Sequence, residues 1–389
     1  MQIHTVKKGD TIFKIARQYS TPPMKIIENN ELESPDRLAV GQKLLILNPT
    51  RTYTVRGSDE LSKIADRFGV KYEKLLANNP YLRGRDKTYP GQILSIKYDA
   101  PRYGMACANG YAYKDVSEDR LALAMPYITY LTSGSGRRVG DEVKKIFDDK
   151  NVVREAKKNG KGVFLRIYDD GIDFSDTYAE NIVKNVKNGG YDGVMMATIG
   201  GMKKTSDKYA DFLMKLKRRL MEEDMLLFSE VDGNDMSEFP DICDGYTVMY
   251  EKSCLESIPD FEEGEEKMMT DYANTCESAK AYIDIPTLAY MGGEELLISE
   301  AEDLAYTAGQ EINYDEKKKI SIFSYNKYRA GKRETVRVAF ESLENLKAKL
   351  ELVGELGFMG ISFDIMKIPV EYLMLFESMF SHPPIYTEM

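Results

Sequence analysis

The amino-acid sequence predicts an α/β protein in which two small βααβ modules precede a (β/α)8 TIM barrel. Two observations carry this prediction. The first hundred residues contain one internal repeat, and beyond residue 101 short β-prone apolar runs alternate with amphipathic stretches of helical periodicity. A length of 389 residues suits several domains. We therefore divide the chain into module 1 at residues 1–49, module 2 at residues 50–99 and a barrel at residues 100–389.

The internal repeat defines the two modules. In module 1 a short β-prone run ends at Val6, and Asp10 or Thr11 can then cap a helix with an apolar stripe. A second helix begins near Met24, and residues 44–46 form the closing strand. The same pattern returns 49 or 50 residues later, so that Val6, Ile15, Asn30, Gly41 and Leu44 recur as Val55, Ile64, Asn79, Gly91 and Leu94.

Eight β-prone runs predict the strands of the barrel. Helical stretches lie between them, including residues 176–187, 206–223 and 342–356. This alternation is typical of a parallel barrel whose functional side chains gather at the C-terminal ends of the strands. The predicted strands are residues 103–108, 128–131, 163–167, 193–198, 226–229, 246–250, 281–289 and 359–363.

Charge is distributed unevenly between the modules and the barrel. Residues 1–100 carry 17 basic and 11 acidic side chains, whereas the remainder carries 36 basic and 52 acidic ones. The two parts are therefore expected to attract each other weakly, since exposed ion pairs contribute only about 0–1 kcal/mol each. The acidic body argues against nucleic acid as a main partner, because nucleic-acid binding depends on neutralising phosphates.

Few histidines and cysteines limit the available chemistry. His4 and His382 lie near opposite ends of the chain, which argues against a Ser-His-Asp triad and against a multi-histidine metal site. We expect neither a metal nor a cofactor. The four cysteines form no CxxC pair, and we interpret them as reduced thiols. The sequence shows no signal-peptide pattern and no apolar run of membrane-spanning length, so we expect synthesis in the cytoplasm without a signal peptide and no membrane insertion.

The two modules resemble the LysM family. The matching segments are HTVKKGDTIFKIARQY, ENN and VGQKLLI in module 1, and YTVRGSDELSKIADRFGV, ANNP and PGQILSI in module 2. The resemblance implies binding of N-acetylglucosamine-containing glycans, in peptidoglycan or chitin, between the loop after the first strand and the loop before the last. Turn formation and helix capping are alternative roles for the same positions. The implied glycan-binding residues are Gly9, Asp10, Thr11, Asn30, Ser58, Asp59, Asn79 and Tyr81.

Residues 102–385 resemble glycoside hydrolase family 18, in particular its LysM-bearing spore-cortex and cell-wall N-acetylglucosaminidases. The segments NGYAYKDVSEDR, PYITYLTS, GGYDGVMMA, DGYTVMYE, AYIDIPTLAY and FESLENLKAKLELVGELGFMGISFDIMKIP follow one another in the order of that family. The resemblance implies substrate-assisted cleavage, which departs from the usual scheme of two carboxylates. In enzymes of that family, a Glu protonates the leaving oxygen, and an Asp two residues before it orients the substrate's acetamide.

The acids of this family motif are absent from the sequence. The motif begins correctly with Asp192, but its acid positions on the fourth strand hold Met195, Ala197 and Ile199. Alternate residues of a strand share one face, so the acids of the motif must stand two residues apart to point into the cleft. A shift in register cannot supply them, because no carboxylate occurs between Asp192 and Asp207. We therefore predict that the chain has no catalytic residues of the family type and negligible family-type catalysis.

Other polar residues follow the predicted strands and are expected to line the cleft of the barrel. Tyr250 matches a family tyrosine, and Glu251 follows it where an Asp is usual. Asp364 stands where the family places a Trp, and the chain contains no Trp. Glu230 follows the fifth strand. One interpretation is that such carboxylates supply a relocated proton donor, and the preferred one is that they are solvated or bind ligand.

These observations predict a glycan-binding protein with an inactive hydrolase-like barrel. The LysM-like modules would anchor it to peptidoglycan or chitin-like glycans, and the barrel would serve as a lectin-like or protein-docking scaffold. The resemblance implies a location in the spore coat, the cortex or the cell wall, with spore-coat proteins as further partners. Two alternatives stay open: an active cell-wall hydrolase with relocated carboxylates, and a structural spore-coat protein whose barrel binds no sugar.

Overall fold

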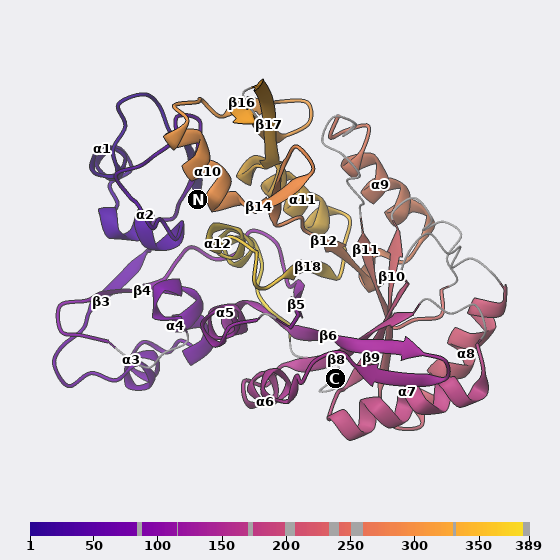
Figure 1. The fold of residues 1–389 in the computed structure, drawn as a ribbon. Coiled ribbons are helices and arrows are strands. Elements are labelled where there is room, and N and C mark those ends of the chain that lie inside the picture. Colours follow the sequence, from indigo (N-terminus) through magenta and orange to yellow (C-terminus); the bar gives the residue numbers. More distant parts are fainter. Residues whose placement is uncertain are drawn as a thin grey trace.

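The computed structural model describes residues 1–83, 88–114, 116–169, 174–198, 207–232, 241–249, 260–329 and 332–383. The two modules lie beside each other along one flank of a barrel (Figure 1). Within the described ranges, no helix combines the length and the apolar character that a membrane span requires.

Each module has the predicted βααβ order, and its two strands pair antiparallel. The core of each module is the predicted helix stripe, with Ile15 and Ile64 buried at equivalent positions. Thr11 is the N-cap of the first helix, because its hydroxyl accepts a hydrogen bond from the Lys14 amide at 3.3 Å. Module 1 contains β1 (Gln2–Thr5), α1 (Ile12–Gln18), α2 (Pro23–Asn29) and β2 (Lys43–Ile46). Module 2 contains β3 (Arg51–Thr54), α3 (Leu61–Phe68), α4 (Tyr72–Ala77), the short 3-10 helix η1 (Pro80–Leu82) and β4 (Ile93–Lys97).

Eight parallel strands form the barrel, as predicted. Neighbouring strands pair in chain order, and the first strand pairs with both the second and the eighth, which closes the barrel. The second strand continues into an antiparallel hairpin with β7 (Glu142–Lys145). The barrel strands are β5 (Cys107–Ala112), β6 (Tyr130–Val139), β8 (Gly162–Asp169), β9 (Gly193–Thr198), β10 (Leu226–Asp232), β11 (Gly245–Met249), β12 (Ala281–Asp284) and β18 (Gly360–Asp364).

Helices connect the barrel strands along the chain, close to the predicted ranges. The helix predicted at residues 342–356 begins after Ser342, whose hydroxyl accepts a hydrogen bond from the Asn345 amide at 3.1 Å. The helices of this part are α5 (Glu118–Ala124), α6 (Lys150–Lys158), α7 (Asp176–Gly189), α8 (Asp207–Met221), α9 (Glu265–Thr275), α11 (Leu343–Glu355) and α12 (Val370–Met379), with the short 3-10 helices η2 (Met125–Tyr127) and η5 (Ser278–Lys280).

Three predicted strands differ from the structure. The second strand, expected at residues 128–131, lies at Tyr130–Val139. The first strand lies at Cys107–Ala112 instead of residues 103–108, because the amides of Tyr103 and Ala106 bond to Met379 and Ser381 near the C-terminal end of the described chain. The run at 281–289 is not one strand. It is interrupted at Pro286, which has no amide hydrogen to donate to a strand neighbour.

A five-stranded antiparallel sheet is inserted between the seventh and eighth barrel strands, and the sequence analysis did not predict it. Phe323, Val338 and Phe340 are buried within it. It consists of β13 (Leu288–Met291), β14 (Glu294–Leu297), β15 (Asn313–Asp315), β16 (Ile320–Arg329) and β17 (Lys332–Glu341), and α10 (Ile298–Thr307) connects β14 to β15. Part of this insertion contacts module 1.

Module 1 docks on this insertion through a close backbone contact. The Ile312 amide donates a hydrogen bond to the Val40 carbonyl at 2.8 Å. Gly41 has a φ of +88°, and a Cβ at this position would overlap the Ile312 carbonyl. Ala39 and Leu45 join the apolar cluster that lies between the barrel strands and their surrounding helices. Ion pairs surround the contact and agree with the expected attraction between a basic module and an acidic body: Arg37 with Asp303 at 3.3 Å and Lys43 with Glu344 at 2.8 Å.

The two repeat glycines provide a test of this docking contact. Gly41 and Gly91 have the same φ of +88°, but a Cβ at Gly91 meets no atom within 4 Å. Gly41→Ala and Gly91→Ala should both lower the free energy of unfolding, by about 1–2 kcal/mol, because both place alanine in the left-handed region. Only Gly41→Ala should also displace module 1, and small-angle scattering should then show a larger radius of gyration. Equal radii for the two variants would contradict the described contact.

Candidate functional site

Alternate residues of the barrel strands face the interior and fill it with large side chains. Phe164 and Phe228 stack there with ring centroids 4.5 Å apart, so the interior is a packed core rather than a pore. Their sequence neighbours Leu165 and Leu227 belong to the separate cluster that contains the helix residues. The interior cluster consists of Cys107, Tyr111, Tyr130, Phe164, Met195, Phe228 and Tyr282.

Strand β9 contributes no acid to this interior among the residues that the structure describes. Met195 is fully buried in the interior cluster, and its Sδ atom lies 3.2 Å from the Tyr111 hydroxyl, which donates to it. Ala197 is also fully buried, and the two-residue period of the strand places it on the same face as Met195. Ile199 lies outside the described residues. The described part of the motif face is therefore apolar.

A buried ion pair between two other strands brings charge into the interior. Arg166 on β8 donates from Nε and Nη2 to the two carboxylate oxygens of Glu230 on β10, at 2.5 and 2.6 Å. Burial opposes the positive charge, but the attraction of Glu230 raises the pKa of Arg166 well above its usual value. Arg166 remains charged, and Glu230 serves as its counter-ion. Glu230, which was expected to be solvated or to bind ligand, is thus buried in the barrel as the partner of Arg166.

A second interior carboxyl, Asp284, was missed by the sequence analysis. It ends β12 and accepts a hydrogen bond from the Ser362 hydroxyl on the neighbouring strand at 3.0 Å. Burial raises its pKa to about 7, and the negative charge of Glu230 adds to this effect. Asp284 can therefore hold a proton near neutral pH. The sequence feature that could have identified Asp284 is its position as a single acidic residue in an otherwise apolar run, two residues before Pro286.

Polar atoms without hydrogen-bond partners accompany these carboxyls among the described residues. They include Nη1 of Arg166, Nδ2 of Asn109 and Oγ1 of Thr247, all buried. Such atoms can bind water or the polar groups of a ligand. Burial also raises the pKa of Tyr111 well above 10, so its phenol stays neutral and can donate a hydrogen bond.

The remaining predicted cleft residues are placed as follows. Asp364 ends β18, accepts a hydrogen bond from the Met366 amide at 2.9 Å and lies 3.4 Å from the Lys367 ammonium. These contacts stabilise the turn that follows the strand. Tyr250 and Glu251 lie outside the described residues.

The predicted LysM residues divide into exposed loop positions and buried structural positions. Gly9, Thr11 and Ser58 are exposed. Asp10 accepts a hydrogen bond from the Lys7 amide at 2.8 Å, and Asp59 accepts the equivalent bond from Arg56 at 2.7 Å. The two aspartates therefore hold the same turn in both modules.

Asn30 and Asn79 connect the second helix of each module to its last strand. Asn30 accepts a hydrogen bond from the Leu45 amide at 2.7 Å and donates to the Ile26 carbonyl at 2.8 Å. Asn79 repeats this arrangement, and both side chains are buried. Their amide groups are therefore occupied by backbone partners. Tyr81 lies at the junction of the modules, where the ammonium of Lys25 is 4.9 Å from its ring centroid.

Phe13 is a further candidate for glycan contact that the sequence analysis missed. Its side chain is 77% exposed in the first turn of α1, directly after the loop that contains Gly9 and Thr11. An exposed aromatic face next to a binding loop can stack on a sugar ring. The equivalent position of module 2 is Ser62. The sequence feature that could have identified Phe13 is an aromatic residue placed outside the apolar stripe of its helix.

No group of three metal-ligating side chains occurs in the described part of the chain. Cys107, Cys243 and Cys276 are free thiols, and Cys254 lies outside the described residues.

The Arg166–Glu230 pair can be tested by unfolding measurements. Arg166→Met or Glu230→Leu alone should lower the free energy of unfolding by about 3–5 kcal/mol, because each leaves a buried charge without its partner. The double variant should be less destabilised than the sum of the two single variants. Matched substitutions in the exposed pair of Lys187 and Glu223 should change stability by about 0–1 kcal/mol. Additive losses at Arg166 and Glu230 would show that the pair is not coupled.

The modules match the LysM domain family over residues 4–47 and 53–97. Over 109 residues the chain is 35% identical to the cell wall-binding protein YocH of Bacillus subtilis (strain 168), a match that covers 27% of this chain and 37% of that protein. Three curated relatives are matched over only 35%, 37% and 38% of their own length.

Solved structures resemble the chain over a greater length. The spore cortex-lytic enzyme SleL of Bacillus megaterium QM B1551 superposes with a TM-score of 0.76 at 22% identity, covering 98% of each chain. A chitinase from Chromobacterium violaceum ATCC 12472 superposes with a TM-score of 0.61 at 14% identity, covering 70% of this chain and 98% of the chitinase. Residues 4–47 and 53–97 are therefore two LysM domains, and the barrel that follows them has the fold of SleL and of chitinases.

Proposed function

We propose that this protein binds peptidoglycan or chitin-type glycans of a bacterial wall through its LysM domains and does not cleave them. The observation that carries the proposal is the combination of two LysM domains with an interior strand face that lacks the acids of the resembling hydrolases. Met195 and Ala197 occupy that face. The spore coat, the cortex or the cell wall is the proposed location, and spore-coat proteins are proposed as further partners. The SleL-like fold supports a spore association.

Two modules on one chain favour attachment to a polymer. When one module is bound, the other is held close to neighbouring sugars, and this raises the effective concentration for the second contact. The excess of basic side chains in residues 1–100 also favours association with acidic wall polymers. Exposed Gly9, Thr11 and Ser58, with Phe13 beside the first loop, are the proposed contact positions.

A barrel without cleavage activity follows from the chemistry of the interior. Leaving-group departure needs a proton donor, and such a donor contributes about 10²–10⁴-fold in rate. Glu230 is not free to serve as this donor, because both of its carboxylate oxygens accept hydrogen bonds from Arg166. The barrel would then act as a lectin-like or protein-docking scaffold. A purely structural coat protein differs from this proposal in that its barrel would bind no sugar.

One observation favours an active hydrolase as a second candidate. Asp284 has a raised pKa of about 7 and faces the interior at the end of a barrel strand, which are the properties of a general acid. If the protein cleaves glycans, Asp284 is the carboxyl we expect to protonate the leaving oxygen.

Glycan anchoring can be tested with Phe13→Ser, which gives module 1 the residue type found at the equivalent position of module 2. The full chain is used because Ala39 and Leu45 pack in the core shared with the barrel. In co-sedimentation with insoluble peptidoglycan and with chitin, affinity should fall by about tenfold, since burying one aromatic face contributes on the order of 1–2 kcal/mol. The control is Met24→Ser, which removes another exposed apolar side chain of module 1. Identical affinities for the two variants would remove Phe13 from the binding surface.

The two candidate functions predict different results with soluble chitin oligomers. The proposed binding function predicts no reducing ends above a buffer control at any pH between about 5 and 8. The second candidate predicts turnover that declines as the pH rises past about 7, where Asp284 loses its proton, and that disappears in Asp284→Asn. Turnover with this profile would replace the binding proposal by the hydrolase.

A further inference from the structure

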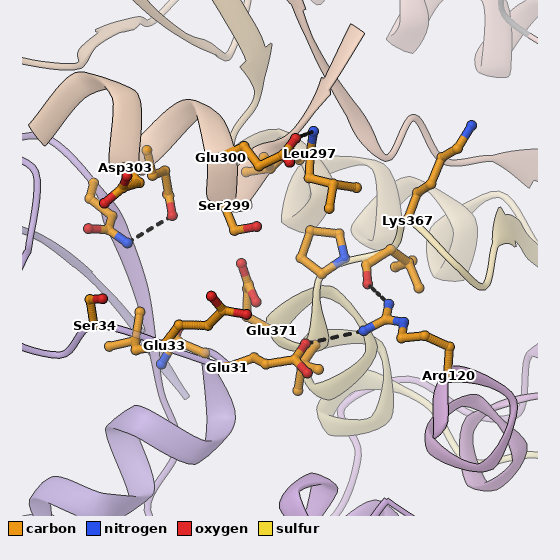
Figure 2. A pocket seen from close by; sticks show the side chains of 18 of the residues that line it. Glu31, Glu33, Ser34, Arg120, Leu297, Ser299, Glu300, Asp303, Lys367 and Glu371 are labelled. Atoms are coloured by element: carbon orange, nitrogen blue, oxygen red, sulfur yellow. Dashed lines mark hydrogen bonds and ion pairs between the residues drawn. The ribbon is translucent and has the colours of Figure 1, made fainter. Parts of the chain in front are cut away.

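A cavity of about 660 Å³ lies between module 1 and the barrel with its insertion, beside their backbone contact. Three segments enclose it: the loop after α2, the N-terminal turn of α10, and the connection that leads from β18 into α12. Figure 2 shows Glu33, Glu371 and Ser299 pointing toward one another across this space, with Arg120 at its margin. Side chains from module 1 and from the barrel therefore share one polar compartment.

The described cations at this cavity bond to other partners. Arg83 and Arg120 both pair with Glu31, at 2.9 and 3.2 Å. Arg120 also donates to the carbonyls of Ile365 at 3.2 Å and of Ile368 at 2.5 Å. Arg37 pairs with Asp303. Among the residues that the structure describes, no cation forms an ion pair with Glu302 or Glu371.

Glu302 and Glu371 consequently favour their protonated forms in the docked arrangement. Burial raises the pKa of Glu302 well above its ordinary value, and the charge of Glu371 adds to the rise. Burial raises the pKa of Glu371 to about 8, with Glu31 adding to the effect and Arg120 opposing it. Glu302 also accepts a hydrogen bond from Gln42 of module 1 at 2.8 Å. The charged groups that face the two carboxyls are Glu31, Glu33, Arg37, Lys43, Arg83, Arg120, Glu300, Asp303, Glu341 and Lys367.

The Gln42 contact joins the module directly to this carboxyl cluster. The Oε1 atom of Gln42 accepts a hydrogen bond from the Ala39 amide at 3.2 Å, which leaves Nε2 to donate to Glu302. Gln92 of module 2 makes the same internal bond to Tyr89. The repeat therefore explains the internal bond in both modules, whereas the bond to Glu302 belongs to the docking of module 1.

We propose that the docking of module 1 on the barrel is controlled by protons: the contact holds while Glu302 and Glu371 are neutral and loosens when they ionise. Ionisation releases each proton to solvent. It places two negative charges beside Glu31 and Glu33 in a compartment whose cations already have partners. Opening the interface lets water reach these carboxylates and removes the repulsion.

The direction of the pH effect follows from linkage. A carboxyl whose pKa is raised in the docked state stabilises docking fully at pH values below its ordinary pKa of 4.5, and this contribution is lost as the pH rises toward about 8. For each such carboxyl, the ratio of open to docked protein rises by up to about tenfold per pH unit over this window. Above the docked pKa the ratio becomes constant. Docking should therefore be tighter in mild acid than in mild base.

Hydrogen exchange of the full chain tests the proposal at the backbone contact. The Ile312 amide reports docking directly because it donates to the Val40 carbonyl. Its exchange, corrected for the intrinsic pH dependence, should accelerate by about tenfold or more between pH 5.5 and 8.5. In Glu302→Gln/Glu371→Gln, which mimics the protonated pair, protection should stay at its mild-acid level across this range. The control Glu294→Gln changes an exposed carboxyl of the insertion that does not line this cavity, and it should behave like the wild type.

Three results would overturn the proposal. Corrected exchange that is constant in the wild type would show that these protons do not control docking. A double glutamine variant that keeps the wild-type pH response would assign that response to other groups. Loss of protection in the double variant at every pH, with unchanged far-UV circular dichroism, would show that the carboxyls hold the interface in their charged form.

Discussion

The alternation of side chains along the barrel strands is the constraint on which the chemistry of this molecule depends. A residue reaches the interior only if it stands in the inward register of its strand. On β9 that register holds Met195 and Ala197, which are both fully buried. The interior charge comes instead from Arg166, Glu230 and Asp284 on three other strands. An acidic function at β9 would therefore need substitutions at the inward positions themselves.

The docking of module 1 shows how one repeated sequence acquires two roles. Gly41 and Gly91 form the same turn with the same φ, and Gln42 and Gln92 make the same internal hydrogen bond. Only the first copy meets Ile312 and Glu302 of the insertion and α10. The first module is thus tied to the barrel by backbone contact, ion pairs and a carboxyl cluster, and its orientation depends on the barrel.

Much of the fold was predictable because it rests on local patterns. The repeat identified both modules down to the helix stripe, and the alternation of strands and helices placed eight barrel strands, three of them with wrong boundaries. The inserted sheet and the pairing of Tyr103 with Met379 depend on contacts distant in sequence, which periodicity does not reveal. The same holds for the site. Glu230 was predicted near the cleft, but its partner Arg166 lies 64 residues away, and the pKa of Asp284 depends on burial.

The function proposed for this protein is to hold wall glycan without cutting it. The most direct measurement incubates the full chain with purified spore cortex or vegetative peptidoglycan, and follows both the bound protein and the soluble fragments in one sample. Sedimented protein is quantified, and the supernatant is analysed by mass spectrometry for fragments with new reducing ends. We expect the protein to sediment with the wall while the fragment profile matches that of untreated wall. New reducing-end fragments that increase with time and with protein concentration would contradict it.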